Sequence, residues 1–392
     1  MVLFLYHIYR SVIMKKLDKV LLKENIEKRI NERISSGMVG GCCAAVMQDG
    51  ELLYKNCFSS QGFEVNENTT FRLASMTKPI TAAAILICID CGLMTLEDKV
   101  SKFVPGFAKM QIGKMNNGEL EIVGDAEKEI TILHLLTHTS GLGSGEVGNY
   151  ALSKMTWEKE QSCLREAVEH YSRSALDFEP FSTQFYSAIF GFDVLARIVE
   201  IATGTQYNDF VRENIFDPLG MKDTTFVPTD DQRNRLIPMH DYIDGKAKAV
   251  DFPVGGMFEG LPLAYFMGGA GLASTVNDYL KFAEMLLNKG EYKGKRIISQ
   301  ELIEAMGTPH VPHEIMPYSE RWGLGVRVIV NEDYKRLPVG SFGWSGAYGT
   351  HFWVDPENKI TAVYLKNSRF DGGSGAETAA HFEEDVTNSF EQ

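Results

Sequence analysis

A serine and a lysine stand three residues apart at the start of an apolar stretch of this chain. Ser75 and Lys78 lie in the segment 71–80, which reads FRLASMTKPI. If a helix begins here, this spacing brings the hydroxyl and the amine onto one helical face. A serine hydroxyl is a weak nucleophile at neutral pH and needs a neighbouring base or charge to react. The pair is therefore a candidate for nucleophilic catalysis, but taken alone this spacing more often belongs to a capping serine followed by a solvated lysine.

Two later segments carry groups suited to the same chemistry. Tyr186 stands in the segment 185–188, FYSA, just ahead of a helical pattern, where a tyrosine beside an ammonium group can take or return a proton. The segment 343–350, GWSGAYGT, stands at the entry to a strand, and its glycines permit close approach of a ligand to the backbone. Each segment has a structural alternative, which is a satisfied core tyrosine for the first and a glycine cluster at a strand edge for the second.

The elements that must position these residues follow from the hydrophobic pattern. Residues 15–36 have apolar side chains at helical spacing and predict an amphipathic helix. Residues 40–58 predict a β-hairpin, with strands at 42–47 and 52–58 and a turn at 48–50. Residues 75–91 are apolar nearly all round and predict a central buried helix that ends before Gly92. Pro79 is compatible with this helix because it falls in the first turn.

The middle of the chain predicts helices, and strands return near its end. Helices are expected at 130–136, 192–202, 207–216 and 276–287, strands at 323–330, 349–354 and 360–365, and a closing helix at 377–390. The fold class is therefore α+β, an antiparallel sheet completed by both ends of the chain and flanked by N- and C-terminal helices, with an inserted, mostly helical subdomain.

The same pattern suggests a division into three parts. Residues 1–36 form an N-terminal segment and amphipathic helix, 37–375 the catalytic domain, and 376–392 a C-terminal helix that packs on the sheet. Within this division we expect a sheet lobe at about 37–74 and 290–392 and a helical lobe at about 75–289. A cleft between two such lobes is a usual place for a site.

Composition limits the partners. The chain has 392 residues, is 44% hydrophobic and 23% charged, and carries a net charge of −13, which predicts a globular protein without disorder. Basic residues cluster nowhere beyond Lys15 and Lys16, so a nucleic-acid partner is disfavoured. Residues 1–13 are apolar but too short to span a bilayer. Either Met14 is the true start, or this segment is a short anchor on a membrane surface.

The cysteines and histidines predict neither a redox pair nor a metal site. Six cysteines without framework spacing fit reduced, buried thiols and a cytoplasmic protein. The C-x-x-C at 88–91 falls near a helix C-terminus and is expected to pack in the core. His134 and His138 have ligand spacing but no acid between them, and His310 and His313 have no evident partner, so no metal is assigned.

The ordered set of motifs resembles the serine β-lactamase-like hydrolases, which include class C β-lactamases, DD-peptidases and related carboxylesterases. S-x-x-K is the nucleophile motif of this wider group. Further segments with the same resemblance are ILHLLTHTSGL at 132–142, NDFV at 208–211, DPLGM at 217–221, GGAGLAST at 268–275 and WGLG at 322–325. The resemblance runs from about residue 40 to about 370 in the family's order.

The resemblance implies roles for individual residues. Ser75 is the nucleophile, Lys78 and Tyr186 handle protons, and the backbone N–H groups of Ser75 and Ala347 form the oxyanion hole. Whether Lys78 or Tyr186 is the general base stays open, since the two should titrate as a coupled pair. A helix N-terminus at Ser75 would favour the developing negative charge. Another reading of Ser345, as a nucleophile elbow near G-x-S-x-G, is disfavoured because strand-like sequence follows it.

Two departures from the family pattern bear on the substrate. Trp344 stands where related β-lactamases and peptidases carry Lys or His, and Ala188 where they carry Asn. With Ser345 and Gly346, these residues are the expected substrate-binding set. Loss of the cation and the amide favours uncharged carboxylic esters, with hydrolysis of β-lactams or D-amino-acid peptides as the alternative. Acyl transfer and a non-catalytic acyl-peptide or antibiotic-binding module also remain open; no cofactor is expected, and the partner is a small-molecule ester or amide.

Overall fold

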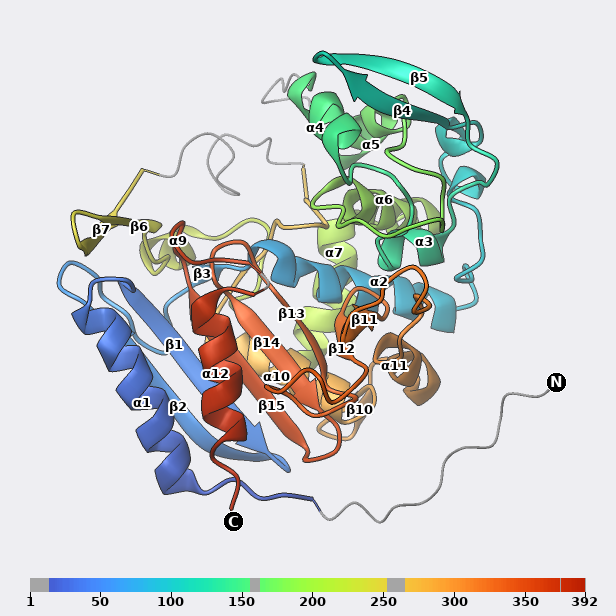
Figure 1. The fold of residues 1–392 in the computed structure, drawn as a ribbon. Coiled ribbons are helices and arrows are strands. Elements are labelled where there is room, and N and C mark those ends of the chain that lie inside the picture. The colour runs from blue at the N-terminus through green and yellow to red at the C-terminus, as the bar shows by residue number, and fades with distance from the viewer. Residues whose placement is uncertain (1–13, 156–162, 252–264, 374, 392) are drawn as a thin grey trace.

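The computed structural model describes residues 14–155, 163–251, 265–373 and 375–391. Its centre is a seven-stranded sheet in the order β11-β12-β13-β14-β15-β1-β2, in which each neighbouring pair is antiparallel. The first strands of the chain lie beside the last ones, as Figure 1 shows in blue and red. The seven strands are β1 (Gly41–Gln48), β2 (Glu51–Ser59), β11 (Glu320–Trp322), β12 (Arg327–Ile329), β13 (Phe342–Ser345), β14 (His351–Asp355) and β15 (Ile360–Lys366). The predicted α+β class with an antiparallel sheet is confirmed.

Two terminal helices cover one face of this sheet. Helices α1 (Lys19–Ser35) and α12 (Glu377–Thr387) lie side by side in front of the strands in Figure 1. Their buried side chains, Leu22, Ile26 and Phe382 among them, form one apolar cluster with Trp353 and Tyr364 of the sheet. We call this the outer face. Burial of these large side chains, each contributing about 1.5–3 kcal/mol, holds the two ends of the chain together.

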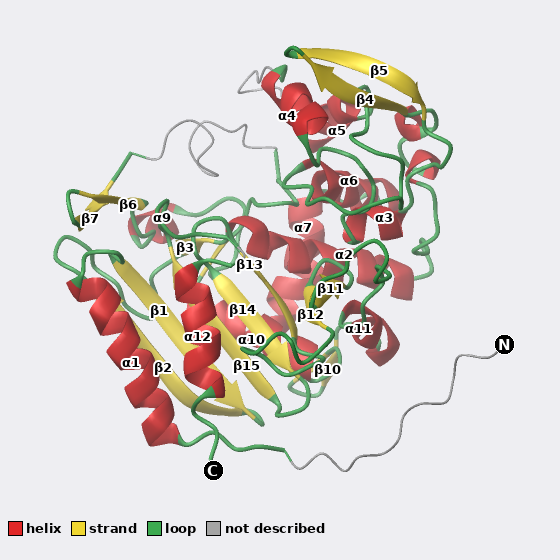
Figure 2. Cartoon of the chain, in the orientation of Figure 1, coloured by secondary structure: helices red, strands yellow, loops and turns green. Residues whose placement is uncertain are grey.

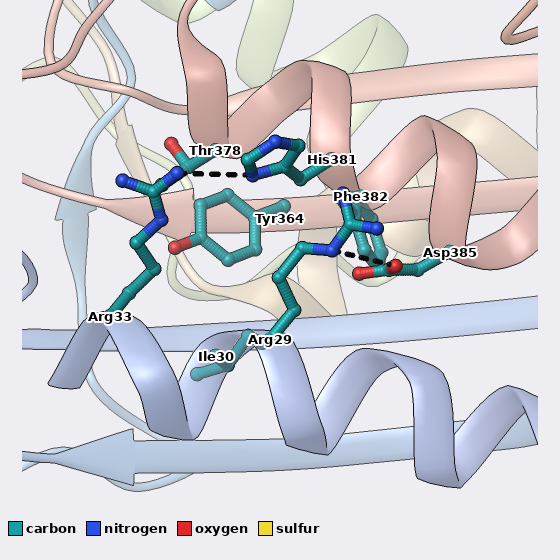
Figure 3. Close-up of a pocket in the computed structure, with 8 residues that line it drawn as sticks. All are labelled: Arg29, Ile30, Arg33, Tyr364, Thr378, His381, Phe382 and Asp385. Atoms are coloured by element: carbon teal, nitrogen blue, oxygen red, sulfur yellow. Dashed lines mark hydrogen bonds and ion pairs between the residues drawn. The ribbon is translucent and has the colours of Figure 1, made fainter. Parts of the chain in front are cut away.

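Polar contacts between α1 and α12 surround a small pocket on this side (Figure 3). In Figure 3 Arg29 and Arg33 extend from α1 toward α12. Arg29 lies 3.1 Å from Asp385, and Arg33 lies 3.2 Å from His381 Nδ1. Burial raises the pKa of Asp385 to about 7, although the Arg29 guanidinium opposes that shift.

The start of α1 shows how a cap sets a helix boundary. The Asp18 side chain accepts hydrogen bonds from the N–H groups of Val20 and Leu21, so the helix begins at Lys19 rather than at residue 15 as predicted. The apolar segment 1–13 lies outside the described residues. Among the residues that are described, no helix has the length and apolar character needed to cross a membrane.

The opposite, inner face of the sheet packs against the helical part of the chain, with α10 directly on β14 and β15. Figure 2 shows that most helices gather on this side, away from α1 and α12. These helices are α2 (Thr77–Asp90), α3 (Ile132–Leu136), α4 (Glu146–Ser153), α5 (Leu164–Tyr171), α6 (Phe190–Thr203), α7 (Tyr207–Val211), α8 (Asp217–Leu219), α9 (Asp230–Asn234), α10 (Val276–Leu287) and α11 (Gln300–Met306). Single turns η1 (Ala74–Met76), η2 (Val100–Lys102) and η3 (Pro105–Phe107) and the π-helical η4 (Arg212–Phe216) complete them.

Small two-stranded sheets interrupt this helical region, which the hydrophobic pattern did not predict. They pair β3 (Phe71–Arg72) with β8 (Ala273–Ser274), β4 (Gln111–Asn116) with β5 (Glu119–Asp125), β6 (His240–Ile243) with β7 (Lys246–Ala249), and β9 (Glu291–Tyr292) with β10 (Lys295–Arg296). The strand predicted at 323–330 is also wrong in its first half: residues 323–326 turn between β11 and β12, with Gly325 at φ 73°. The proposed division into lobes stays a prediction.

One pair of cysteines departs from the prediction of six reduced thiols. Cys43 of β1 and Cys57 of β2 are directly opposite in the hairpin register, their Cα atoms lie 4.2 Å apart, and a disulfide joins them. Sequence spacing did not indicate this pairing, because the strand register creates it. The remaining cysteines of the chain, Cys42, Cys88, Cys91 and Cys163, are free. The predicted cytoplasmic location, which rested on reduced thiols, stays a prediction.

Candidate active site

The serine and the lysine meet at the start of the central helix, as their spacing predicts. Ser75 lies in the turn η1 and Lys78 in the first turn of α2, and Lys78 Nζ lies 3.4 Å from Ser75 Oγ. Helix α2 is buried around almost its whole circumference, which fixes the pair between the sheet and the other helices. Ala74, directly before the serine, has φ of 47°, a left-handed conformation that alanine rarely adopts. The backbone is therefore strained at the nucleophile position.

Lys78 uses its hydrogen-bonding capacity fully. Besides its contact with Ser75, Nζ donates to the carbonyl oxygen of Ala188 at 2.6 Å and to that of Gly269 at 2.8 Å. An ammonium group has three N–H donors, and three acceptors surround it here. The side chain is completely buried. Ala188, predicted to bind substrate, thus contributes its backbone carbonyl to the lysine.

Tyr186 lies over the lysine in the loop that precedes α6. Lys78 Nζ is 5.0 Å from the centroid of the tyrosine ring, within the range of a cation–π contact. The indole Nε1 of Trp344, at the end of β13, donates to the Tyr186 hydroxyl at 3.3 Å. The structure therefore brings Ser75, Lys78, Tyr186 and Trp344 together from three distant segments.

A cluster of aromatic side chains packs around Tyr186 and Trp344. Trp322 packs against Trp344 with ring centroids 4.6 Å apart and stacks on Tyr186 at 6.0 Å. His138 lies 4.6 Å from the Tyr186 ring and 4.4 Å from the Trp322 ring. Its Nδ1 accepts a hydrogen bond from the backbone N–H of Ser187, and burial together with the Lys78 charge holds its pKa well below the usual range. The neutral His138 therefore packs against the Tyr186 ring and accepts a hydrogen bond from the loop that carries it.

The turn after β13 approaches the serine closely, and a glycine makes this possible. A Cβ atom at Gly346 would lie 2.2 Å from the carbonyl oxygen of Leu73, which belongs to the turn of the nucleophile. The hydroxyl of Thr350 bonds the same carbonyl at 2.8 Å. Ala347 follows Gly346 and is exposed at this junction. The oxyanion role of the Ser75 and Ala347 N–H groups stays a prediction, but the two segments are adjacent.

Ser345 is expected to bind substrate, but its hydroxyl lies on the other side of the sheet. Successive residues of a strand point to opposite faces, and Trp344 packs with the inner cluster. Ser345 Oγ lies 2.7 Å from Nδ1 of His351, its cross-strand partner, and His351 Nε2 lies 3.1 Å from Glu383 of α12. A neutral His351 with its proton on Nε2 accepts from Ser345 and faces the Glu383 carboxylate. This buried chain was not predicted.

The structure also places the motifs to which the sequence assigned no chemistry. His134 accepts the N–H of Thr131 as part of a capping box, and the described residues contain no group of side chains that could hold a metal ion. Ser345 ends a strand that turns into β14, so the strand–serine–helix geometry of an elbow is absent there. Cys88 is buried at the end of α2 as predicted, but Cys91, which follows the helix, is exposed rather than packed in the core, and the two are not paired with each other.

Comparison with known proteins identifies the family of the chain. The family model named Beta-lactamase matches residues 24–384. Protein Rv1367c of Mycobacterium tuberculosis is 30% identical over 359 residues, covering 86% of this chain and 88% of that protein. Esterase EstB of Burkholderia gladioli is 28% identical over 394 residues, covering 93% and 95%. The structure of EstCE1, a hydrolase with promiscuous acyltransferase activity, has the same fold, with a TM-score of 0.78 at 24% identity and coverage of 94% and 99%. The chain belongs to the beta-lactamase family.

Proposed function

We propose that this protein is a serine hydrolase that acts on carboxylic esters through an acyl-enzyme on Ser75. The observation that carries the proposal is the 3.4 Å contact between Ser75 Oγ and the buried Lys78 Nζ, beneath the ring of Tyr186. A hydroxyl attacks a carbonyl only if its proton is removed as the bond forms. We assign the removal of this proton, and its later return to the leaving alcohol, to Lys78 acting from its free-amine form and to Tyr186.

Stabilisation of the oxyanion would come from backbone donors. The N–H of Ser75 lies in the turn that opens α2, where the helix dipole favours negative charge. The N–H of Ala347 is the second expected donor, supplied by the turn that Gly346 brings against Leu73. Loss of one such donor costs about 2.7–4 kcal/mol of transition-state stabilisation in other hydrolases. Water, or an alcohol acceptor, then releases the acyl group.

The wall of the site supports the preference for esters. Trp344 presents an indole where related β-lactamases and peptidases have a cation, and its single N–H donor is directed at Tyr186. An uncharged acyl group packs on such a surface without desolvating a carboxylate. That the relative EstB is an esterase agrees with this preference. Hydrolysis of β-lactams or D-amino-acid peptides is the second candidate, because the family includes enzymes of both kinds.

The test compares the wild type with Ser75→Ala and Ser345→Ala on a p-nitrophenyl ester, a cephalosporin and a fluorophosphonate probe. We expect ester turnover and probe labelling in the wild type and in Ser345→Ala, and neither in Ser75→Ala. Undiminished ester turnover in Ser75→Ala would contradict the mechanism. Turnover of the cephalosporin without the ester would instead replace the ester preference with the β-lactamase reading.

A further inference from the structure

A buried aspartate lies behind the lysine. Asp193, in the first turn of α6, is completely inaccessible to solvent. Its Oδ2 accepts hydrogen bonds from the hydroxyls of Tyr265 and Tyr171, the latter at 3.2 Å. Its Oδ1 accepts the backbone N–H of Gly269 at 3.2 Å. Three donors thus converge on one carboxylate, a pattern that favours its ionised form.

The same glycine connects Asp193 to the site. Gly269 gives its N–H to Asp193 and its carbonyl oxygen to Lys78 Nζ, so one residue bridges the carboxylate and the ammonium. A side chain at this position would press on the backbone of Ala188 and Ile189 at 3.1–3.2 Å. The segment around Gly269 is therefore held in a fixed position between α2 and α6.

Lys78 and Asp193 are both buried and can carry opposite charges. Lys78 is buried, and among the described residues its direct hydrogen-bond acceptors are neutral oxygens, from Ser75 and two backbone carbonyls. A buried ammonium without a countercharge is costly. The two charges interact: burial raises the pKa of Asp193 to about 6, and the Lys78 ammonium is among the groups that hold it from rising further.

We propose that Asp193 is a positioning residue for the reaction: through Gly269 it fixes the acceptor of Lys78, and its carboxylate supplies the countercharge for that buried lysine. The proposal rests on the proposed function of Lys78 as a proton-handling group. Among the described residues, the titratable groups that face Asp193 are Lys78 of α2, Tyr171 of α5, Tyr207 of α7 and Tyr265. Of these, Lys78 is the one cation.

The first test is the pH profile of kcat/KM for a p-nitrophenyl ester in Asp193→Asn. Asparagine keeps the shape of the side chain and the acceptor for Gly269 but removes the charge. Loss of a neighbouring negative charge disfavours an ammonium, so the limb of the profile that is assigned to Lys78 should move to lower pH in Asp193→Asn. The limb should move to lower pH whether the free amine or the ammonium of Lys78 is the active form. Profiles that superimpose would overturn the proposal.

Two controls separate charge from structure. Glu200→Gln removes the same charge from the same helix at a residue that pairs with Arg197 at 2.8 Å, and its profile should match the wild type. Tyr171→Phe removes one hydrogen bond of Asp193 but keeps the carboxylate. Above pH 7, the limb of the profile that is assigned to Lys78 should therefore lie at the same pH as in the wild type. If Ser75→Ala is inactive and the pH profile of Asp193→Asn matches the wild type, this inference is wrong but the proposed function stands. If Ser75→Ala is active, the proposed function itself is wrong.

A second measurement covers the case in which Asp193→Asn does not fold. The Lys78 charge is among the groups that lower the pKa of Asp193, so removal of that charge must raise the pKa of the aspartate. Aspartate labelled with ¹³C at the carboxyl group should show a resonance that titrates near pH 6 in the wild type and at higher pH in Lys78→Met. An unmoved titration would overturn the proposal without any reference to activity.

Discussion

The buried carboxylate of Glu383 gives the sharpest prediction about stability. It lies on α12 with a side-chain exposure of 2%, and it accepts hydrogen bonds from Arg327 at 2.6 Å, Arg336 at 2.9 Å and the Tyr334 hydroxyl at 2.6 Å. The perturbation is Glu383→Gln, which keeps the size of the side chain and removes its charge.

The magnitude follows from what this change leaves behind. Arg327 is 6% exposed, and in the part of the chain that the structure describes it would keep Glu320, at 3.2 Å, as its one charged partner. Breaking a buried ion pair from one side costs about 3–5 kcal/mol, because the remaining charge is buried without compensation. Glu384→Gln changes the next residue in the same way, but its side chain is 40% exposed and pairs with Arg29 at the surface. That loss should be about 0–1 kcal/mol.

Urea unfolding at pH 7, followed by tryptophan fluorescence, measures both losses. The pH dependence gives a second check. Burial acts to raise the pKa of Glu383, but the opposing effect of Arg327 and His351 is larger. The pKa of Glu383 therefore lies well below the ordinary 4.5. The folded state therefore gains stability from the ionised form above pH 4.5, and this gain declines as pH falls below that value. Equal losses in the two variants, or a Glu383→Gln loss that stays constant down to pH 3, would refute the reasoning.

Three further predictions concern single residues. Ala74→Gly relieves the left-handed φ of 47° and should raise the free energy of unfolding by up to about 1 kcal/mol; a decrease would contradict the strain. Trp344→Phe keeps an aromatic ring at this position but removes the N–H donor to the Tyr186 hydroxyl. We expect kcat to fall about fivefold, which corresponds to the loss of one neutral hydrogen bond, and an unchanged kcat would exclude a role for that bond. For Asp385 the folded-state pKa of about 7 lies above the ordinary 3.8, so its contribution to stability is greatest at acid pH and is lost as pH rises through 7. Asp385→Asn should thus gain thermal stability relative to the wild type between pH 5 and pH 8, and a relative loss over that interval would show that the ion pair with Arg29 dominates.

Much of the frame was predictable because local patterns coincide with the structure. The predicted helix at 276–287 is α10 residue for residue, and the hairpin at 40–58 matches β1 and β2 to within one residue. Apolar residues at helical or strand spacing, bounded by glycine and turn residues, are sufficient for elements of this kind. The contact between Ser75 and Lys78 is also local, since one helical turn joins them.

Contacts between distant segments were not predictable from such patterns. Gly269, which bridges Lys78 and Asp193, is 191 residues from the lysine along the chain. Asp193 itself reads as an ordinary polar position near the start of a helix. The disulfide between Cys43 and Cys57 depends on the register of the hairpin, which a shift of one residue would have abolished. Tertiary packing decides these features, and one sequence carries no direct signal of it.

The most direct test of the central claim is to locate the covalent intermediate. The wild-type protein is mixed with a slowly hydrolysed ester or a fluorophosphonate, quenched in acid, digested and sequenced by mass spectrometry. Acylation or phosphonylation of Ser75, absent from Ser75→Ala and retained in Ser345→Ala, is the predicted result. An adduct on Ser345 or any other residue, or full turnover without an adduct on Ser75, would contradict the account.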